Sequence, residues 1–397
     1  MEDIKRVKLS EIVELITKGT TPTTLGYEFQ DEGVNFLKIE CFDENGGFIE
    51  SKVAHISEEC HKKMKRSQLK NGDILFSIAG AIGRVAIVTE EMLPANINQA
   101  LAIIRISDEQ VYLPYIKLIL TSPIVIEQFE RKKQGVAQLN LSLKDINEIS
   151  IPLPSKDKQI ELAELFDKVV GVISKRNKEL SALDDLIKAR FVEMFGNPVT
   201  NEKGWKQRQL GEITTKIGSG ATPKGGKEAY QEEGITLIRS MNVHNGLFEY
   251  KELAHISEEQ AEKLDNVTIE ENDVLLNITG ASVARSCVVP SKILPARVNQ
   301  HVCIIRCNQC IVPEFLNKLL IDDNYQRLLW SIAEAGATRE AITKQQVESL
   351  QIIMPPIELQ EQFADFVHQV DKSKVAVQKA LDETQMLFDS LMQKYFA

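Results

Sequence analysis

The sequence has no long hydrophobic run, which argues against a protein built from membrane-spanning helices. No apolar stretch approaches the roughly 18–20 residues that such a helix needs. The opening residues, Met-Glu-Asp-Ile-Lys, lack the charged and then apolar order of a secretion signal. With 43% hydrophobic and 26% charged residues in a chain of 397, the composition is typical of a globular protein of about two domains. We therefore expect a cytoplasmic protein with no membrane partner.

Cysteine is scarce, and six residues in a chain of this size do not indicate a disulfide scaffold. Three of them lie close together in "VCIIRCNQC" as Cys303, Cys307 and Cys310. A zinc site would need a second Cys or His pair at finger-like spacing, and none is present. We predict no metal site here, but one cysteine inside a strand and two at its end.

The sequence also lacks a complete catalytic motif. "GSGATPKGGK" (218–227) resembles a phosphate-binding loop, but Ala221 replaces its first glycine and Glu228 replaces the Ser or Thr after the lysine. No H-E-x-x-H, G-x-S-x-G or dinucleotide-binding fingerprint occurs. We predict that this chain is not an enzyme and has no catalytic residue.

The sequence does have an internal repeat. The letters "AHISEE" occur at 54–59 and again at 254–259, and the flanking sequences also correspond. The other matching pairs are "LSEIVELITKGTTPT" with "LGEITTKIGSGATPK", "EGVNFLKI" with "EGITLIRS", "NGDILFSIAGAIGR" with "ENDVLLNITGASVAR", and "NQALAIIR" with "NQHVCIIR". A repeat of this length predicts two copies of one domain.

The repeated segments predict an α/β domain. Apolar runs such as "DILFSI" and "LAIIRI" are typical of strands. Ser57 and Ser257 stand where a helix N-cap is expected, each followed by two glutamates, and Gln260 completes a capping box. "AHISEE" is then a strand that leads into a capped helix. His55 and His255 are expected to be structural.

A long heptad pattern follows each copy, after the proline-marked junctions "IPLPSKDKQ" and "IIMPPIELQ". In the first helix the apolar positions are Leu162, Phe166, Val169, Ile173, Leu180, Leu183, Ile187 and Met194. In the second they are Phe363, Val367, Val370, Val377, Leu381, Phe388, Leu391 and Tyr395. Four residues interrupt the pattern: Arg176, Arg190, Lys374 and Thr384. Two such stripes in one chain are expected to pair.

The predicted fold class is α+β, with two tandem α/β domains, each followed by a long helix, and the helices paired as an antiparallel coiled coil with pseudo-two-fold symmetry. The predicted segments are a first domain at 1–155, a central helix at 156–199, a second domain at 200–356 and a C-terminal helix at 357–397. Two similar domains at a fixed spacing suit a protein that contacts two DNA half-sites. Two alternatives are an adaptor whose domains bind proteins and an enzyme with a pocket repeated in both copies. No repeated pair of titratable groups supports the enzyme.

In this order and in duplicate, the motifs resemble the specificity subunit of type I restriction–modification systems. The stretches that carry the resemblance are "KGTTPT" and "GSGATP", "SIAGAIGRVAIV" (77–88), the two "NQ" strands, and "GVAQLNLSLKDINEISIPLPSKDKQIELAELFD" (135–167). The second copy departs from this pattern with "AGATREAITKQQV" (335–347) and "IIMPPIE".

The resemblance implies a non-catalytic subunit in which each target-recognition domain contacts one half of a split double-stranded DNA target and the helices set the spacer. It also implies that the helices dock methyltransferase subunits, which bind S-adenosylmethionine and methylate adenine, and that a motor–nuclease restriction subunit joins them. A methylation-only complex is a narrower alternative. The residues predicted to bind a partner are Leu162, Phe166, Val169, Ile173, Leu180, Leu183, Phe363, Val370, Leu381 and Phe388.

The candidate DNA-binding residues are basic or small polar residues in loops and on one helix, because such groups contact phosphates and base edges. In the first copy they are Lys18, Thr20, Thr21, Lys38, Lys62, Lys63, Lys65, Arg66, Arg84, Lys132, Lys133 and Gln138. In the second they are Lys216, Ser219, Thr222, Lys224, Lys227, Arg239, Arg285 and Arg339. The run "HKKMKR" could equally be a solvated helix face, and the aligned pairs Lys38/Arg239 and Arg84/Arg285 could be internal salt-bridge partners.

An excess of positive charge is absent. The net charge is −10, and each recognition domain has more acidic than basic residues. This charge argues against a protein that holds nucleic acid by bulk electrostatic attraction alone. We expect partner subunits to supply much of the phosphate contact, so that the isolated chain binds DNA weakly.

Overall fold

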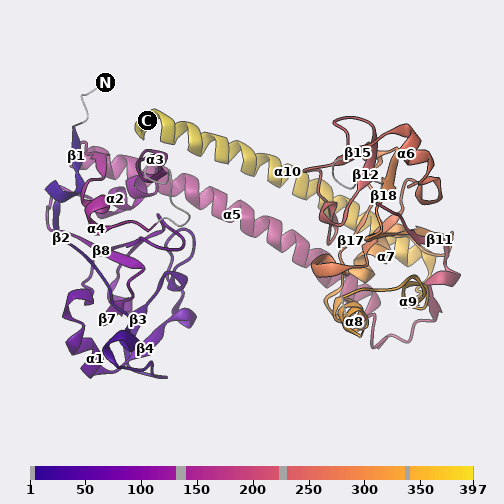
Figure 1. Ribbon diagram of the computed structural model, residues 1–397, viewed down its shortest axis with the longest axis horizontal. Coiled ribbons are helices and arrows are strands. Elements are labelled where there is room, and N and C mark those ends of the chain that lie inside the picture. Colours follow the sequence, from indigo (N-terminus) through magenta and orange to yellow (C-terminus); the bar gives the residue numbers. More distant parts are fainter. Residues whose placement is uncertain (1–4, 131–139, 223–229, 336–339, 397) are drawn as a thin grey trace. The chain divides into compact units, whose positions relative to one another are not determined.

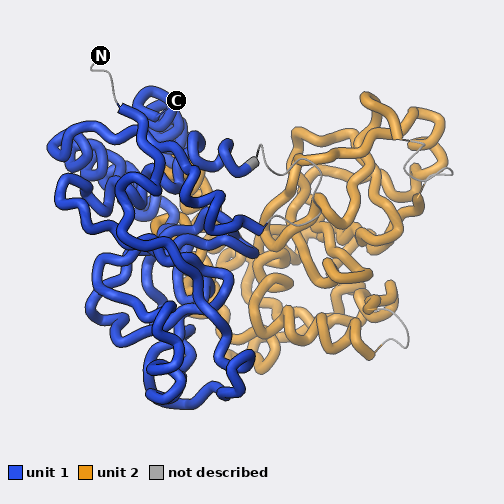
Figure 2. Tube along the Cα trace, turned by 60° about the vertical axis from the view of Figure 1, so that its left-hand side comes forward, with its two compact units in different colours: residues 1–177, 379–397 blue, residues 178–378 orange. Residues whose placement is uncertain are grey.

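The computed structural model describes residues 5–130, 140–222, 230–335 and 340–396. The chain forms two compact units, coloured separately in Figure 2. Unit 1 contains Met1–Asn177 and Lys379–Ala397, and unit 2 contains Lys178–Gln378. This division differs from the four predicted segments, because each unit combines one α/β domain with parts of both long helices.

The main sheet of unit 1 is antiparallel and has four strands. Its order is β2 (Val13–Lys18), β8 (Leu101–Ile106), β5 (Ile74–Ser77) and β6 (Val85–Ile87). All four residues of β5 are buried, as are the first four of β8. These central strands are buried on both faces, which explains why the sequence shows continuous apolar runs there instead of alternation.

A smaller sheet in unit 1 has the order β4 (Ala54–Ile56), β3 (Val34–Leu37) and β7 (Ala95–Ile97), with β3 and β7 parallel. The helix α1 (Glu58–Lys63) follows β4, and the Ser57 hydroxyl accepts a hydrogen bond from the Cys60 amide at 3.2 Å. The predicted strand and capped helix are therefore confirmed. Figure 1 shows α1, β3, β4 and β7 at the end of unit 1 away from α2 and α5.

The remaining elements of unit 1 connect the sheets to the long helix. The helices are α2 (Leu113–Leu120), α3 (Pro123–Glu130) and α4 (Leu143–Asn147), and β1 (Arg6–Lys8) pairs with β9 (Ser150–Pro152) before α5 (Lys156–Phe195) begins. The short 3-10 helices are η1 (Leu9–Glu11), η2 (Pro22–Leu25), η3 (Ile39–Cys41), η4 (Glu50–Lys52), η5 (Lys65–Ser67) and η6 (Glu90–Met92).

Unit 2 repeats this topology. Its main sheet has the order β11 (Thr214–Ser219), β19 (Val302–Cys307), β16 (Val274–Asn277) and β17 (Ser286–Val288). Its smaller sheet has the order β15 (Ala254–Ile256), β12 (Ile235–Ile238) and β18 (Ala296–Val298), and β10 (Gln207–Gln209) pairs with β20 (Gln351–Ile353). A short hairpin of β13 (Val243–His244) and β14 (Leu247–Phe248) stands where unit 1 has a single bridge between Phe42 and Phe48.

The helices of unit 2 correspond to those of unit 1. They are α6 (Glu258–Glu262), α7 (Pro313–Leu320), α8 (Asp323–Glu334), α9 (Lys344–Glu348) and α10 (Ile357–Phe396). The short 3-10 helices are η7 (Leu210–Glu212), η9 (Ser240–Asn242), η10 (Asp265–Val267), η11 (Gly280–Ser282) and η12 (Ser291–Ile293). The Ser257 capping box with Gln260 is present, as the sequence predicts.

Both long helices contribute to the core of each α/β domain. In unit 1 the core contains Phe166 from α5 and Phe396 from α10, whose ring centroids lie 5.4 Å apart. In unit 2 it contains Phe195 from α5 and Phe363 from α10, also with centroids 5.4 Å apart. Burial of these helix ends fuses helix and domain into one unit.

A buried glutamine fixes the start of each long helix to its domain. The Gln159 carbonyl accepts from the Tyr112 amide at 2.9 Å, and its amide donates to the carbonyls of Gln110 and Pro154. Gln360 makes the equivalent contacts with the Val312 amide and the carbonyls of Cys310 and Pro355. Both glutamines are at most 1% exposed.

Within each unit, segments of α5 and α10 run antiparallel. In unit 1, Lys158 lies over the Tyr395 ring while Phe166 contacts Phe388. The predicted interruptions in unit 2 form their own contacts: Lys374 donates to Asp184 at 2.6 Å, and Arg190 lies over the Phe366 ring. Lys374 and Arg190 thus each contact the partner helix, whereas the Thr384 hydroxyl donates to the Ala380 carbonyl within its own helix.

None of the helices in the described residues is long and apolar enough to span a membrane. The predicted positions of the three cysteines are confirmed. Cys303 is buried in β19, Cys307 is the last residue of that strand and is half-buried, and Cys310 is exposed beyond the strand.

Candidate nucleic-acid interface

In each unit a glycine-containing loop leaves the first strand of the main sheet and lies against the small sheet. A Cβ atom at Gly19 would overlap the carbonyl oxygen of Ile97, and one at Gly220 would overlap that of Val298. The Gly19 amide lies 3.4 Å from the Leu101 carbonyl, and the Gly220 amide lies 3.1 Å from that of Asn299. Only glycine permits this close approach. The first residues of the predicted Thr- and Gly-rich loops are therefore held against the small sheet.

A repeated side-chain hydrogen bond follows each of these glycines. The Thr21 hydroxyl donates to the carbonyl oxygen of the Gln99 side chain, and the Thr222 hydroxyl donates to that of Gln300. We call each of these contacts a Thr–Gln pair. Both glutamines are exposed, in the turn between the small sheet and the main sheet. The sequence analysis selected the two threonines but missed the glutamines, although both "NQ" motifs contain them.

The two units differ beside this pair. In unit 2 the Gln300 side-chain amide lies 3.0 Å from Nε2 of His301, and Nδ1 of His301 bonds the Thr279 hydroxyl. In unit 1 the corresponding residues are Ala100 and Ala79, which have no polar side-chain atoms. The two units therefore present different polar groups beside equivalent Thr–Gln pairs.

The aligned cations Lys38 and Arg239 each lie over an aromatic ring. The Lys38 ammonium is 4.9 Å from the centroid of Phe29, and the Arg239 guanidinium is 5.6 Å from that of Tyr230. Arg239 also donates to the Glu252 carbonyl. Neither cation forms an ion pair with another described residue, so the predicted salt-bridge alternative is not realised there.

The aligned pair Arg84 and Arg285 lies half-buried beneath the turn that follows η3 or η9. Arg84 donates to the Phe42 carbonyl at 3.1 Å, and Nη1 of Arg285 lies 3.4 Å from Nδ1 of His244. These contacts tie each arginine to its own domain, and no ion pair to a described carboxylate is formed by either.

The basic run of unit 1 lies on α1 and η5, where Lys62, Lys63, Lys65 and Arg66 are exposed. Lys62 pairs loosely with Glu58 at 3.5 Å, across two strongly exposed side chains. The other three form no ion pair within the described part of the chain. In unit 2 the same positions hold Glu262, Lys263, Asp265 and Asn266, and Lys263 pairs with Glu259 at 2.6 Å. Only unit 1 presents a cluster of cations on this helix.

A buried polar residue joins this helix to the small sheet in each unit, but its identity changes. In unit 1 the Asn96 side chain bonds His61 at 2.5 Å and donates to the Met64 carbonyl. In unit 2 Arg297 donates to the Ala261 carbonyl at 3.1 Å and to Asp265 at 3.0 Å. The exposed side chains of this helix thus differ between the units, whereas in both units a buried polar residue connects the helix to the small sheet.

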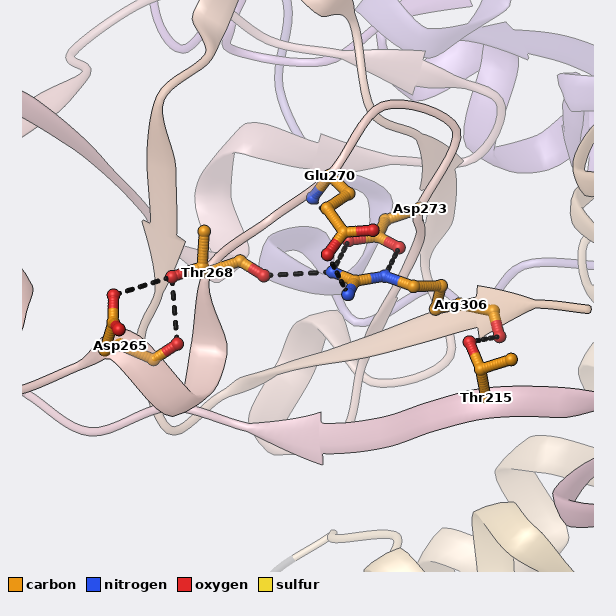
Figure 3. A network of polar contacts seen from close by, with 6 residues as sticks. All are labelled: Thr215, Asp265, Thr268, Glu270, Asp273 and Arg306. Carbon is orange, nitrogen blue, oxygen red and sulfur yellow. Dashed lines mark hydrogen bonds and ion pairs between the residues drawn. The ribbon is translucent and has the colours of Figure 1, made fainter.

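Each main sheet also contains a buried ion pair that the sequence analysis missed. Asp73 pairs with Arg105 in unit 1, and Asp273 with Arg306 in unit 2. Arg306 further contacts Glu270 and the Thr268 carbonyl, as Figure 3 shows. Hydrogen bonding to the aspartate raises the pKa of both guanidinium groups. A repeated titratable pair therefore does exist, but the aspartates are at most 1% exposed. The pair is structural.

The remaining predicted DNA-binding residues fall into two groups. Lys18, Thr20 and Ser219 are exposed and Lys216 is half-buried, all on or just after β2 and β11. The residues that lie outside the described part of the structure are Lys132, Lys133, Gln138, Lys224, Lys227 and Arg339. DNA contact by any of the predicted residues stays a prediction.

Half of the residues predicted to bind a partner are buried within the chain itself. Leu162, Phe166 and Phe363 are at most 1% exposed, and Val169 and Val370 are also buried. The others are half-buried: Ile173, Leu180, Leu183, Leu381 and Phe388. The exposed apolar side chains of the helices are different ones: Val172, Leu186, Val192, Val375, Met386 and Leu387.

Comparison with known proteins identifies the repeated domain. The type I restriction modification DNA specificity domain family matches residues 1–182 and, a second time, residues 202–384. The specificity subunit of the type I restriction enzyme EcoBI of Escherichia coli is 28% identical over 218 residues, 51% of this chain and 44% of that protein. The chain therefore matches less than half the length of that relative. The putative type I restriction enzyme MjaX specificity subunit of Methanocaldococcus jannaschii is 24% identical over 415 residues, 96% of this chain and 91% of that protein.

Solved structures share the fold at low sequence identity. The type I restriction-modification S subunit from M. genitalium is 15% identical, with a TM-score of 0.57 over 100% of this chain and 97% of that one. A chain from a study of complex assembly and conformational transition of the type I R-M system is 18% identical, with a TM-score of 0.60 over 98% of this chain and 96% of that one. The family match covers both copies of the domain and most of the chain. This chain belongs to the type I restriction modification DNA specificity domain family.

Proposed function

We propose that this chain is the DNA sequence-specificity subunit of a type I restriction–modification complex and is itself non-catalytic. Each recognition domain contacts one half of a bipartite double-stranded target. The helices α5 and α10 set the spacer between the halves and dock methyltransferase subunits. S-adenosylmethionine binds to those subunits, and a motor–nuclease subunit joins them for restriction.

The observation that carries this proposal is one domain frame, present twice, with different polar groups at equivalent places. The Thr–Gln pairs repeat, whereas His301 replaces Ala100 and Arg297 replaces Asn96. A protein that contacts two different half-sites needs this combination of a constant frame and variable surface chemistry.

The adaptor alternative receives less support. It requires exposed apolar patches on both domains. The exposed residues Met241, Leu247 and Tyr250 lie close in sequence in unit 2. The corresponding positions in unit 1 are Glu40, Gly47 and Glu50, and the exposed apolar residues Leu25 and Phe29 of unit 1 lie elsewhere in the sequence. Among the described residues the two copies therefore share no equivalent apolar patch. The family match in both copies favours DNA recognition.

The test is to map methylated adenines in cells that carry this chain with its methyltransferase. We expect one bipartite motif with a fixed spacer, which disappears when the gene for this chain is deleted. A continuous motif, or methylation that does not depend on this chain, would contradict the proposal. Loss of unmethylated phage DNA in the same cells separates a restriction complex from a methylation-only complex.

Affinity measurements test whether the partner subunits supply much of the contact with the DNA phosphates. Because the chain has a net charge of −10, we expect the isolated chain to bind DNA weakly and with little sequence preference. Addition of the methyltransferase should raise both affinity and specificity. Nanomolar, sequence-specific binding by the isolated chain would show that it needs no phosphate contacts from a partner.

A further inference from the structure

We propose that Gln99 and Gln300 are base-contacting side chains, one for each half of the bipartite target, and that Thr21 and Thr222 are the positioning residues that orient them. This inference rests on the proposed function and assigns specificity within it. It starts from the two Thr–Gln pairs, which occupy the same place in both units.

The backbone around each glutamine is a fixed turn. The Asn98 side chain accepts a hydrogen bond from the Ala100 amide at 3.2 Å, and the Asn299 side chain accepts one from the His301 amide at 3.0 Å. The glutamine between them is exposed in each unit. The turn therefore presents one flexible amide side chain to solvent, and the threonine restricts its orientation.

Stability alone does not explain the Thr–Gln pairs. The loop is already held by its glycine, which packs against a carbonyl and has its own amide hydrogen bond. One exposed neutral hydrogen bond between side chains adds little to the stability of the fold. Restricting an exposed side chain before binding, by contrast, lowers the entropy cost of ordering it in a complex. The presence of the same contact in both units fits a role in orienting the glutamine for binding.

The free groups of the glutamine match a base edge. The threonine hydroxyl occupies one lone pair of the carbonyl oxygen, so a second lone pair and the N–H donors remain in unit 1. An adjacent acceptor and donor fit the N6 amine and N7 of adenine in the major groove. We therefore assign adenine as the base that Gln99 prefers.

His301 changes the hydrogen bonds of the corresponding glutamine, Gln300, in unit 2. For a neutral imidazole, acceptance at Nε2 from the Gln300 amide places the ring proton on Nδ1, which then donates to the Thr279 hydroxyl oxygen. Gln300 is thereby held at both ends and keeps one free N–H. Unit 2 thus presents an adenine-contacting glutamine beside an imidazole. Unit 1 has no imidazole at this place because residue 100 is alanine.

The test uses the complex of this chain with its methyltransferase on duplex DNA randomised across both half-sites, followed by sequencing of the methylated products. Gln99→Glu keeps an acceptor for Thr21 but removes the N–H donors. We expect adenine preference at one position of one half-site to fall roughly 10- to 100-fold, with cytosine gaining. Gln300→Glu should do the same in the other half-site only.

Two further variants separate orientation from contact. Thr21→Val should reduce the preference at the Gln99 position, and Thr21→Ser should restore it, because serine keeps the hydroxyl. Gln110→Glu, at another exposed glutamine of unit 1, is the matched control and should leave every base preference unchanged. Thermal melting of each complex verifies that the variants fold.

The outcomes distinguish this inference from the proposed function. If the wild-type complex yields a bipartite motif and the Gln99 and Gln300 variants keep every base preference, the inference is wrong and the proposed function stands. If the wild-type complex yields no motif, the proposed function fails and the inference fails with it.

Discussion

The carboxylate of Asp73 binds the guanidinium of Arg105 through both oxygens, with Nε and Nη2 each 2.7 Å from one of them. Asp273 and Arg306 repeat the contact at 2.8 and 2.9 Å. Asp73 and Asp273 also accept backbone hydrogen bonds, from Lys70 and Glu270. Each pair joins the loop before one central strand to the neighbouring strand.

Removal of one partner of this ion pair should strongly destabilise the fold. Asp273→Ala leaves the largely buried Arg306 guanidinium without its main counter-charge, so we expect the free energy of unfolding to fall by about 3–5 kcal/mol. Urea denaturation followed by circular dichroism measures this change. Glu259→Ala, which breaks the exposed pair with Lys263, is the control and should change stability by less than about 1 kcal/mol. Equal effects of the two variants would refute a structural role.

Gln360→Leu should separate the start of α10 from its domain. The substitution removes the hydrogen bonds to Val312, Cys310 and Pro355 and leaves a Val312 amide without its partner. We expect a loss of about 2–4 kcal/mol in the stability of unit 2, seen as faster hydrogen exchange in α7 and α10. Gln362→Leu, at an exposed position of the same helix, should have little effect.

Removal of positive charge from the basic helix of unit 1 should weaken DNA binding without changing its specificity. Replacement of Lys62, Lys63, Lys65 and Arg66 by glutamine removes up to four interactions with phosphates. The slope of log K against log salt should become shallower by about 0.9 for each phosphate interaction that is removed, equally for all sequences. Lys263→Gln in unit 2 is the matched control. A changed base preference would show that these residues contact bases instead.

Longer helices should change the spacer and not the half-sites. Four residues inserted in α5 after Asn177, with four in α10 after Gln378, lengthen each helix by about 6 Å. These are the positions at which the units meet along the chain. Methylome sequencing should then give the original half-sites with a spacer longer by roughly one or two base pairs. An unchanged spacer would argue against the helices as the determinant of spacing.

The cysteines should differ in reactivity toward Ellman's reagent. Burial raises the pKa of Cys303 to about 12 and that of Cys307 to about 12, so at pH 8 only roughly one thiol in ten thousand is ionised. Cys310 is exposed and should react first. Cys303 should react only after denaturation, and rapid labelling of Cys303 in the native protein would contradict its burial.

The sequence alone determined the features that depend on neighbouring residues. Heptad spacing predicted helices at 156–199 and 357–397, and the structure has helices at Lys156–Phe195 and Ile357–Phe396. The Ser57 and Ser257 caps were predicted because an N-cap requires only a hydroxyl and the amides of the next turn. Duplication was visible because both copies keep the same letters in the same order.

Only the tertiary structure decided which distant residues meet. Thr21 meets Gln99, Asp73 meets Arg105, and Phe166 meets Phe396, because strand order and helix packing bring together segments that the chain holds far apart. It also placed the heptad residues near the ends of both helices in the domain cores, a contact that periodicity alone does not reveal. Periodicity reports which face of an element is apolar, but the partner of that face depends on the free energy of the whole folded chain.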